Sequence, residues 1–219
     1  MSAPVFKFTP VVIVGAGRSG TNALRDMLTR LPDFATWDCD EINPIWRHGN
    51  LSWPNDEIPA ANATPRIRRF IRSAFERLWH QAGQPRFVVE KTCANSLRVP
   101  FVDAVLPEAK YVHIVRSGVD VVASARKRWR GELEVPTLSY FASKIKYTPL
   151  LDLPLYGWSF LRSRVGMMMG KTNRLSVWGP RYDGMISMND APLEEICARQ
   201  WAACVERADA AFKQIDPAC

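Results

Sequence analysis

Short apolar runs alternate along the chain with longer segments in which apolar residues recur every three or four positions. Three of the runs are rich in β-branched residues and are followed by glycine or polar residues: 11–14, 87–89 and 111–115. Runs of this kind are typical of buried strands in a parallel sheet. A weaker run at 174–178 predicts a further strand.

The segments with helical periodicity lie between and after these runs. We expect helices at 21–31, 65–81, 99–106, 121–129 and 192–213. Asp120 precedes the fourth of these segments and is expected to be its N-cap, with Ser124 on its first turn. Segments 33–60 and 131–170 are predicted to be irregular, the first as a long functional loop. The alternation indicates an α/β fold in three layers, with a mostly parallel central sheet and helices on both faces, and we expect residues 1–219 to form a single domain.

Composition and charge narrow the function classes. The chain has 29 Lys and Arg against 22 Asp and Glu, a formal net charge of +7, which favours anionic partners. Basic residues gather at 66–72 and at 126–130. Charge runs on helices are usually solvated faces, so we predict no nucleic-acid partner. No segment approaches the roughly 20 apolar residues of a membrane span, and we expect a cytoplasmic protein.

The five cysteines, at positions 39, 93, 197, 204 and 219, form no C-x-x-C pair. We interpret them as reduced thiols and predict no metal site.

A glycine-rich turn at residues 15–22 follows the first strand and opens the first helix. Free backbone N–H groups and the helix dipole favour phosphate binding there. The turn matches the dinucleotide pattern G-x-G-x-x-G, but segment 32–37 lacks a convincing second strand, so a Rossmann-type oxidoreductase is the weaker alternative. It also approaches the Walker A pattern. Thr21 and Asn22 stand where an ATP or GTP hydrolase needs Lys and Ser or Thr, which argues against that class.

Three motifs resemble the sulfotransferase family. Arg18-Ser19-Gly20-Thr21 is similar to the loop that binds the 5′-phosphosulfate in that family. Arg116 ends a strand and Ser124 follows eight positions later, at the spacing of the two residues that hold the donor's 3′-phosphate. Lys91, in Glu-Lys-Thr at the end of another strand, matches the lysine that reaches the phosphosulfate bridge. None of these residues alone indicates the family; the resemblance rests on the occurrence of all three motifs in the family's order.

The resemblance implies a P-loop-like fold and an enzyme that uses 3′-phosphoadenosine 5′-phosphosulfate (PAPS) as donor. A sulfuryl group would pass to an acceptor hydroxyl by in-line displacement without a metal, releasing adenosine 3′,5′-bisphosphate (PAP). The implied donor-binding residues are Arg18, Ser19, Gly20, Thr21, Asn22, Arg116 and Ser124. Arg18 and Lys91 are assigned to the leaving-group side. A non-catalytic nucleotide-binding remnant is the other alternative.

The general base is the point where the motifs diverge. Family members that sulfate small molecules have Lys-Thr-His, whereas this chain has Lys91-Thr92-Cys93. Tyrosylprotein sulfotransferases use a Glu in a Cys-x-Glu context, which is similar to Cys39-Asp40-Glu41. Glu41 is therefore the candidate base, with Asp40 and His48 in reserve. His113 lies mid-strand and is interpreted as a buried structural residue.

The acceptor is left open among a glycan, a peptide tyrosine and a small molecule. Five residues of the first loop are candidates for the acceptor pocket: Asn43, Trp46, Arg47, His48 and Asn50. Residues 178–181 are expected near the nucleotide or the acceptor, although core packing explains Trp178 equally well. Family members commonly continue with a Tyr-Glu-Asp-Leu-like strand, so the chain is interpreted as a short or truncated form with an exposed sheet edge.

Overall fold

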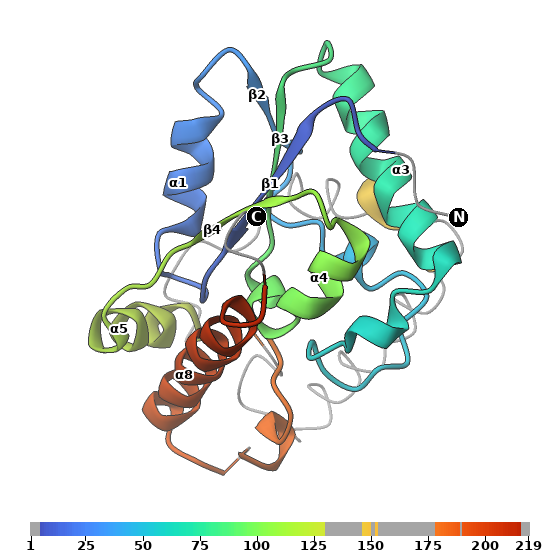
Figure 1. Ribbon diagram of the computed structural model, residues 1–219. Coiled ribbons are helices and arrows are strands. Elements are labelled where there is room, and N and C mark those ends of the chain that lie inside the picture. Colours follow the sequence, from blue (N-terminus) through green and yellow to red (C-terminus); the bar gives the residue numbers. More distant parts are fainter. Residues whose placement is uncertain (1–4, 130–145, 150–151, 153–177, 189, 216–219) are drawn as a thin grey trace.

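A parallel sheet of four strands forms the centre of the computed structural model, which describes residues 5–129, 146–149, 152, 178–188 and 190–215 (Figure 1). The strands are β1 (Thr9–Val14), β2 (Phe34–Ala35), β3 (Phe87–Lys91) and β4 (Lys110–His113). Their order is β2-β3-β1-β4. The predicted strands at 11–14, 87–89 and 111–115 are confirmed with shifted ends. Residues 174–177 lie outside the described residues, and Trp178 is not in a strand.

Strand β2 corrects the prediction that segment 33–60 is irregular throughout. Phe34 and Ala35 pair in parallel with Phe87 and Val88 of β3. The rings of Phe34 and Phe87 stack with centroids 4.5 Å apart. Two residues are too few to give a periodic pattern, so this strand depends on its pairing with β3 rather than on a local signal.

The helices that surround the sheet are α1 (Thr21–Leu28), α2 (Asn43–Trp46), α3 (Pro65–Gln81), α4 (Val99–Val105), α5 (Gly118–Trp129) and α8 (Leu193–Phe212). Short 3₁₀ turns lie at Ala60–Asn62, Cys93–Leu97 and Met185–Met188. The predicted helices are confirmed, and α3 has the predicted ends. Helix α1 ends three residues early because its last turn tightens, with the Leu31 N–H donating to the Leu28 carbonyl at 3.0 Å.

Helix α5 begins three residues earlier than predicted. The Val121 N–H donates to the Ser117 carbonyl at 3.1 Å, which adds a turn before Val121. A side chain at Gly118 would lie 2.8 Å from the Trp201 ring, so the glycine allows α8 to pack closely against this first turn. Asp120 is therefore inside the first turn rather than at the N-cap, and Ser124 is on the second turn.

The two faces of the sheet bury alternate residues of β1. Val12 and Val14 pack in the large core with α3 and α4, whereas Val11 and Ile13 pack against α1. Figure 1 shows α1 on one side of the sheet and α3 and α4 on the other, which confirms the predicted three layers. Within the described residues, no helix has both the length and the apolar character needed to cross a membrane.

The loops that follow β1 and β4 meet at Gly15. A Cβ at this position would lie 2.7 Å from the Ile114 carbonyl oxygen, so only glycine lets the two backbones approach this closely. Strands β3, β1 and β4 are adjacent and parallel, so their carboxyl ends lie at the same edge of the sheet. Ligands of open α/β sheets bind at such an edge.

Candidate active site

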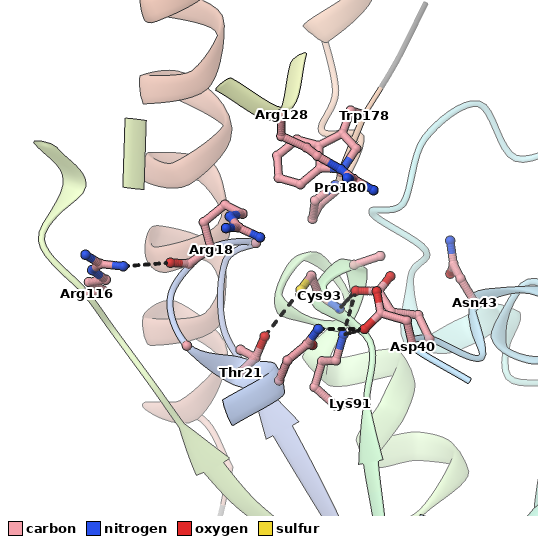
Figure 2. Close-up of a pocket in the computed structure, with 16 residues that line it drawn as sticks. Arg18, Thr21, Asp40, Asn43, Lys91, Cys93, Arg116, Arg128, Trp178 and Pro180 are labelled. Carbon is pink, nitrogen blue, oxygen red and sulfur yellow. Dashed lines mark hydrogen bonds and ion pairs between the residues drawn. The ribbon is translucent and has the colours of Figure 1, made fainter. Parts of the chain in front are cut away.

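A cavity of about 670 Å³ lies at the carboxyl ends of the strands (Figure 2). Its lining includes residues of the glycine loop, of the loop that carries Asp40 and Glu41 (the carboxylate loop), and of the strand ends. The lining residues are Gly17, Arg18, Gly20, Thr21, Asn22, Asp40, Glu41, Asn43, Lys91, Cys93, Ala94, Arg116, Arg128, Trp178, Gly179 and Pro180. The cavity therefore brings all three sequence motifs into one site.

The glycine loop has the geometry of an anion cradle. Arg18 and Gly20 have φ angles of 71° and 96°, both in the left-handed region. These turns bring the loop to the start of α1, where Gly20 gives no side-chain cap. The Ser19 hydroxyl is buried without a hydrogen-bond partner among the described residues. Uncapped N–H groups and an unpaired buried hydroxyl fit a bound phosphate or sulfuryl group.

Arg116 and Ser124 both contact Arg18. The Arg18 Nε donates to the Ser124 Oγ at 2.9 Å, and an Arg116 Nη1–H donates to the Arg18 carbonyl at 3.4 Å. Arg116 also pairs with Asp120 at 3.6 Å, with both side chains about half exposed. The described contact of the Arg18 side chain is therefore with Ser124, while Lys91 has partners of its own.

Lys91 is held by two carboxylates. Its Nζ lies 3.0 Å from the Asp40 Oδ1 and 3.2 Å from the Glu41 Oε1, and Glu41 also accepts the Cys93 backbone N–H at 3.1 Å. Burial alone would lower the pKa of Lys91, but the Glu41 and Asp40 charges outweigh it and raise that pKa above its ordinary value. The amine therefore stays protonated at neutral pH.

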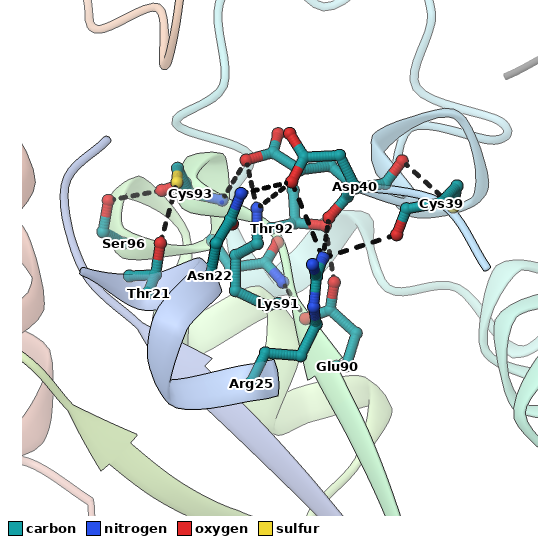
Figure 3. Close-up of polar contacts among 12 residues, drawn as sticks. Thr21, Asn22, Arg25, Cys39, Asp40, Glu90, Lys91, Thr92, Cys93 and Ser96 are labelled. Atoms are coloured by element: carbon teal, nitrogen blue, oxygen red, sulfur yellow. Dashed lines mark hydrogen bonds and ion pairs between the residues drawn. The ribbon is translucent and has the colours of Figure 1, made fainter. Parts of the chain in front are cut away.

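Asp40 and Glu41 have unequal surroundings (Figure 3). The Asp40 Oδ1 accepts from the Asn22 amide at 2.8 Å as well as from Lys91, and Arg25 lies 3.6 Å away. Although burial acts in the opposite direction, these partners lower the pKa of Asp40. Its lowered pKa makes Asp40 a weak candidate for accepting a proton from a substrate.

Cys93 stands where a small-molecule sulfotransferase would have its histidine. Its Sγ lies 3.7 Å from the Thr21 Oγ1, and burial raises the pKa of the thiol well above its usual value. A neutral thiol does not accept a proton at neutral pH. The backbone of Cys93, rather than its side chain, contributes to the site by binding Glu41.

A buried polar network links the carboxylate loop to β3, and sequence reasoning missed it. The Arg98 guanidinium donates to the Asn95 Oδ1 at 2.9 Å and the Asn43 Oδ1 at 2.6 Å, and it lies 3.7 Å from Asp56. Burial lowers the pKa of Arg98 to about 10, which still leaves it charged at neutral pH. Since Asn43 follows Glu41 in the chain and Asn95 follows Lys91, Arg98 connects the two segments that carry these groups.

Most of the loop residues expected to line the acceptor pocket do not reach the cavity. His48 contacts Asp152 at 2.8 Å and packs against Phe70 with ring centroids 3.7 Å apart. Trp46, Arg47 and Asn50 are buried elsewhere, because this segment forms α2 and contributes to the core. Asn43 alone of the five lines the cavity. His113 is half-buried, 3.4 Å from Asp209 and away from the cavity.

Trp178 closes the cavity on the side of the glycine loop. Its ring would lie 3.3 Å from a Cβ placed on Gly17. Gly179 and Pro180 continue this wall, whereas the Arg181 N–H donates to Asp56 at 2.9 Å. Sequence reasoning placed Trp178 near the site or in the core, and the structure supports both, because Trp178 lines the cavity and also packs against the core cluster that contains Ala125 and Trp129.

Replacing Glu90 with glutamine is expected to remove a pH-dependent loss of stability. Burial raises the pKa of Glu90 from 4.5 to about 7, although Thr92 and Asn95 donate to it. The folded state therefore holds a proton that the unfolded state releases, and the free energy of unfolding falls as the pH rises from 4.5 to 7. Urea unfolding of the Glu90→Gln variant should show its advantage over the parent growing across that interval and levelling above it. A difference that does not change with pH would contradict the buried, proton-holding carboxyl.

Comparison with known proteins assigns the family. A model of the sulfotransferase family matches residues 10–152, which is more than half of the chain. The chain belongs to the sulfotransferase family. The resemblance stated from the three motifs is confirmed, and so is the α/β fold class.

Solved structures similar to this sulfotransferase are themselves sulfotransferase domains. The domain from the curacin biosynthetic pathway superposes with a TM-score of 0.50 and 14% identity, over 96% of this chain and 64% of that one. The domain from the Synechococcus PCC 7002 olefin synthase is 24% identical over 57% of this chain and 55% of that one, with a TM-score of 0.38. This sulfotransferase thus spans less than two thirds of either chain. No curated protein matches it.

Proposed function

We propose that this sulfotransferase transfers a sulfuryl group from PAPS to an acceptor hydroxyl. The observation that supports the proposal is that Arg116, Lys91 and Glu41 line one and the same cavity, with Arg116 well apart from Lys91 in Figure 2. The spacing suits a donor that carries a phosphate on one side and a reactive phosphosulfate on the other. Arg116 and Ser124 would hold the 3′-phosphate, and residues 19–22 would hold the 5′-phosphate.

The donor supplies an activated sulfuryl group, and the chain's own residues position it. Lys91, protonated and buried, would lie beside the phosphate oxygen that becomes the leaving group and would neutralise the charge that develops there. Arg18 would add a second cation by turning from Ser124 toward the phosphosulfate. The Ser19 hydroxyl would gain the partner that it lacks among the residues that the structure describes.

Glu41 would act as the general base. The acceptor oxygen forms a bond to sulfur, the bond between sulfur and the bridging phosphate oxygen breaks, and the acceptor proton passes to the Glu41 carboxylate. Lys91 contacts Glu41 and would also lie beside the leaving group, so the two ends of the reaction share one amine. Asn43, on the same loop as Glu41, would lie on the acceptor side of the cavity. A glycan, a peptide tyrosine and a small molecule are the acceptor classes to screen.

No group of three potential metal ligands occurs among the residues that the structure describes. We propose transfer without a metal, so donor binding and turnover should persist in EDTA.

Calorimetric titration with PAP in EDTA tests the donor site. Arg116→Ala is expected to weaken PAP binding by about tenfold to a hundredfold, because it removes charge-assisted hydrogen bonds to a phosphate. Arg199→Ala, which removes an exposed arginine paired with Glu195, is the matched control and should bind as the parent does. Titration with NAD should give no heat of binding.

The same titration separates the alternatives. Binding of NAD that does not depend on Arg116 would favour the dinucleotide oxidoreductase. Binding of PAP by a protein that transfers no label from ³⁵S-labelled PAPS to any acceptor class would favour a nucleotide-binding remnant. Absence of PAP binding by folded protein would overturn the proposed donor.

A further inference from the structure

The basic run on α5 does not form one solvated face. Arg126 pairs with Glu194 of α8 at 2.7 Å, and Lys127 is exposed. Arg128 is half-buried and lines the cavity. Because successive helical residues differ by about 100° in direction, only one of three consecutive side chains can face the site. Figure 2 shows Arg128 beside Trp178 at the cavity.

Arg128 lies one helical turn after Ser124. Residues four positions apart on a helix have Cβ atoms about 5–6 Å apart on the same face. Ser124 and Arg128 therefore lie on the same face of α5, one turn apart. Ser124 is in turn bound to Arg18 at 2.9 Å, and Arg18 to Arg116 through its carbonyl. Ser124 is therefore bound to Arg18, Arg18 contacts Arg116, and Arg128 follows one turn later on the helix that carries Ser124.

The charge of this group suits a phosphate monoester. Arg18, Arg116 and Arg128 are all cationic, and Arg116 is also paired with Asp120. A phosphate monoester carries close to two negative charges at neutral pH, because its second pKa is about 6. Arginine can also bind two phosphate oxygens at once.

We infer that Arg128 is a further ligand of the donor, binding its 3′-phosphate together with Ser124. The inference rests on the proposed function, since it assigns Arg128 to the nucleotide of that same site. It gives the helix that carries Ser124 two contacts with the phosphate, one turn apart. Arg128 then contributes to discrimination between nucleotides with and without a 3′-phosphate.

The test compares two neighbouring arginines and two nucleotides. Arg128→Met and Arg126→Met each remove one positive charge from α5, but only the first changes the cavity lining. Their affinities for PAP are measured by calorimetry in EDTA, and those for adenosine 5′-monophosphate, which lacks the 3′-phosphate, by competition. Arg128→Met should weaken PAP binding by about tenfold to a hundredfold and leave the monophosphate within about twofold. Arg126→Met should change neither, and thermal unfolding confirms that both variants are folded.

Each other result overturns the inference in a recognisable way. Equal weakening of both nucleotides would mean that Arg128 acts on the common part of the nucleotide or through general electrostatics. Unchanged PAP binding would mean that it does not contact the nucleotide. If the parent itself failed to bind PAP, the proposed donor would be wrong, a result that is visible before any variant is compared.

Discussion

The Glu41→Gln variant is expected to lose about 10²- to 10⁴-fold in turnover while binding PAP within about twofold of the parent. Glutamine keeps the shape of the side chain, and its carbonyl can still accept from Lys91 and from the Cys93 N–H. It cannot take a proton from the acceptor. The loss should therefore fall on the chemical step, measured as transfer of label from ³⁵S-labelled PAPS to the acceptor found by screening.

Asp40→Asn is the matched control for this variant. Asp40 is the adjacent carboxylate on the same loop and contacts the same amine, but its contacts with Asn22 and Lys91 favour the ionised form. Its turnover should stay within about tenfold of the parent. The reverse outcome, with Asp40→Asn inactive and Glu41→Gln active, would move the role of general base to Asp40.

The fold could be predicted from the sequence where a strand is buried on both faces or where a helix has a periodic apolar face. The runs that form β1 and β3 are continuous apolar segments. Helix α3 has an apolar stripe along one face, Thr64 as its N-cap and a proline at its first position. Strand β2 could not be predicted, because two residues have no period and the Phe34 ring depends on Phe87, more than 50 positions away. The start of α5 depends in the same way on Trp201 packing against Gly118.

The site was predictable to the extent that its motifs are local. The glycine loop follows β1, Lys91 ends β3 and Arg116 comes shortly after β4, and the carboxyl ends of parallel strands meet at one edge. Contacts between loops were not predictable. His48 was a reasonable reserve base in sequence but is turned toward Asp152, and Arg98 gave no signal that it would be buried between Asp56 and Asn43. The positions of the His48 and Arg98 side chains depend on the tertiary packing of the carboxylate loop.

The charge of Lys91 between Asp40 and Glu41 affects how an anionic donor can enter the cavity. Asp40 and Glu41 together carry two negative charges, and Lys91 and Arg25 are the cations within 4 Å of them among the described residues. The carboxylates are therefore balanced only while Lys91 is present. An anionic phosphosulfate entering beside this amine depends on that balance, since the negative charges of the donor and the carboxylates repel one another.

The Lys91→Met variant is accordingly expected to lose about 10²- to 10³-fold in turnover and also to bind PAPS more weakly. The leaving phosphate oxygen would have no buried cation beside it, and Asp40 and Glu41 would repel the donor. Lys7→Met, which removes an exposed lysine that does not line the cavity, should leave both quantities unchanged. Transfer of ³⁵S label and calorimetry with PAPS measure the two effects separately.

A double variant separates repulsion from lost stabilisation. Adding Asp40→Asn to Lys91→Met removes one of the unbalanced charges, so the affinity for PAPS should return toward that of the parent. Turnover should stay low, because no cation has been restored beside the leaving group. The two changes should therefore be non-additive in binding, as expected for groups whose atoms lie 3.0 Å apart. If the second change recovered neither affinity nor turnover, the weak binding of Lys91→Met would come from a loss of direct contact, and the carboxylates would not oppose the donor.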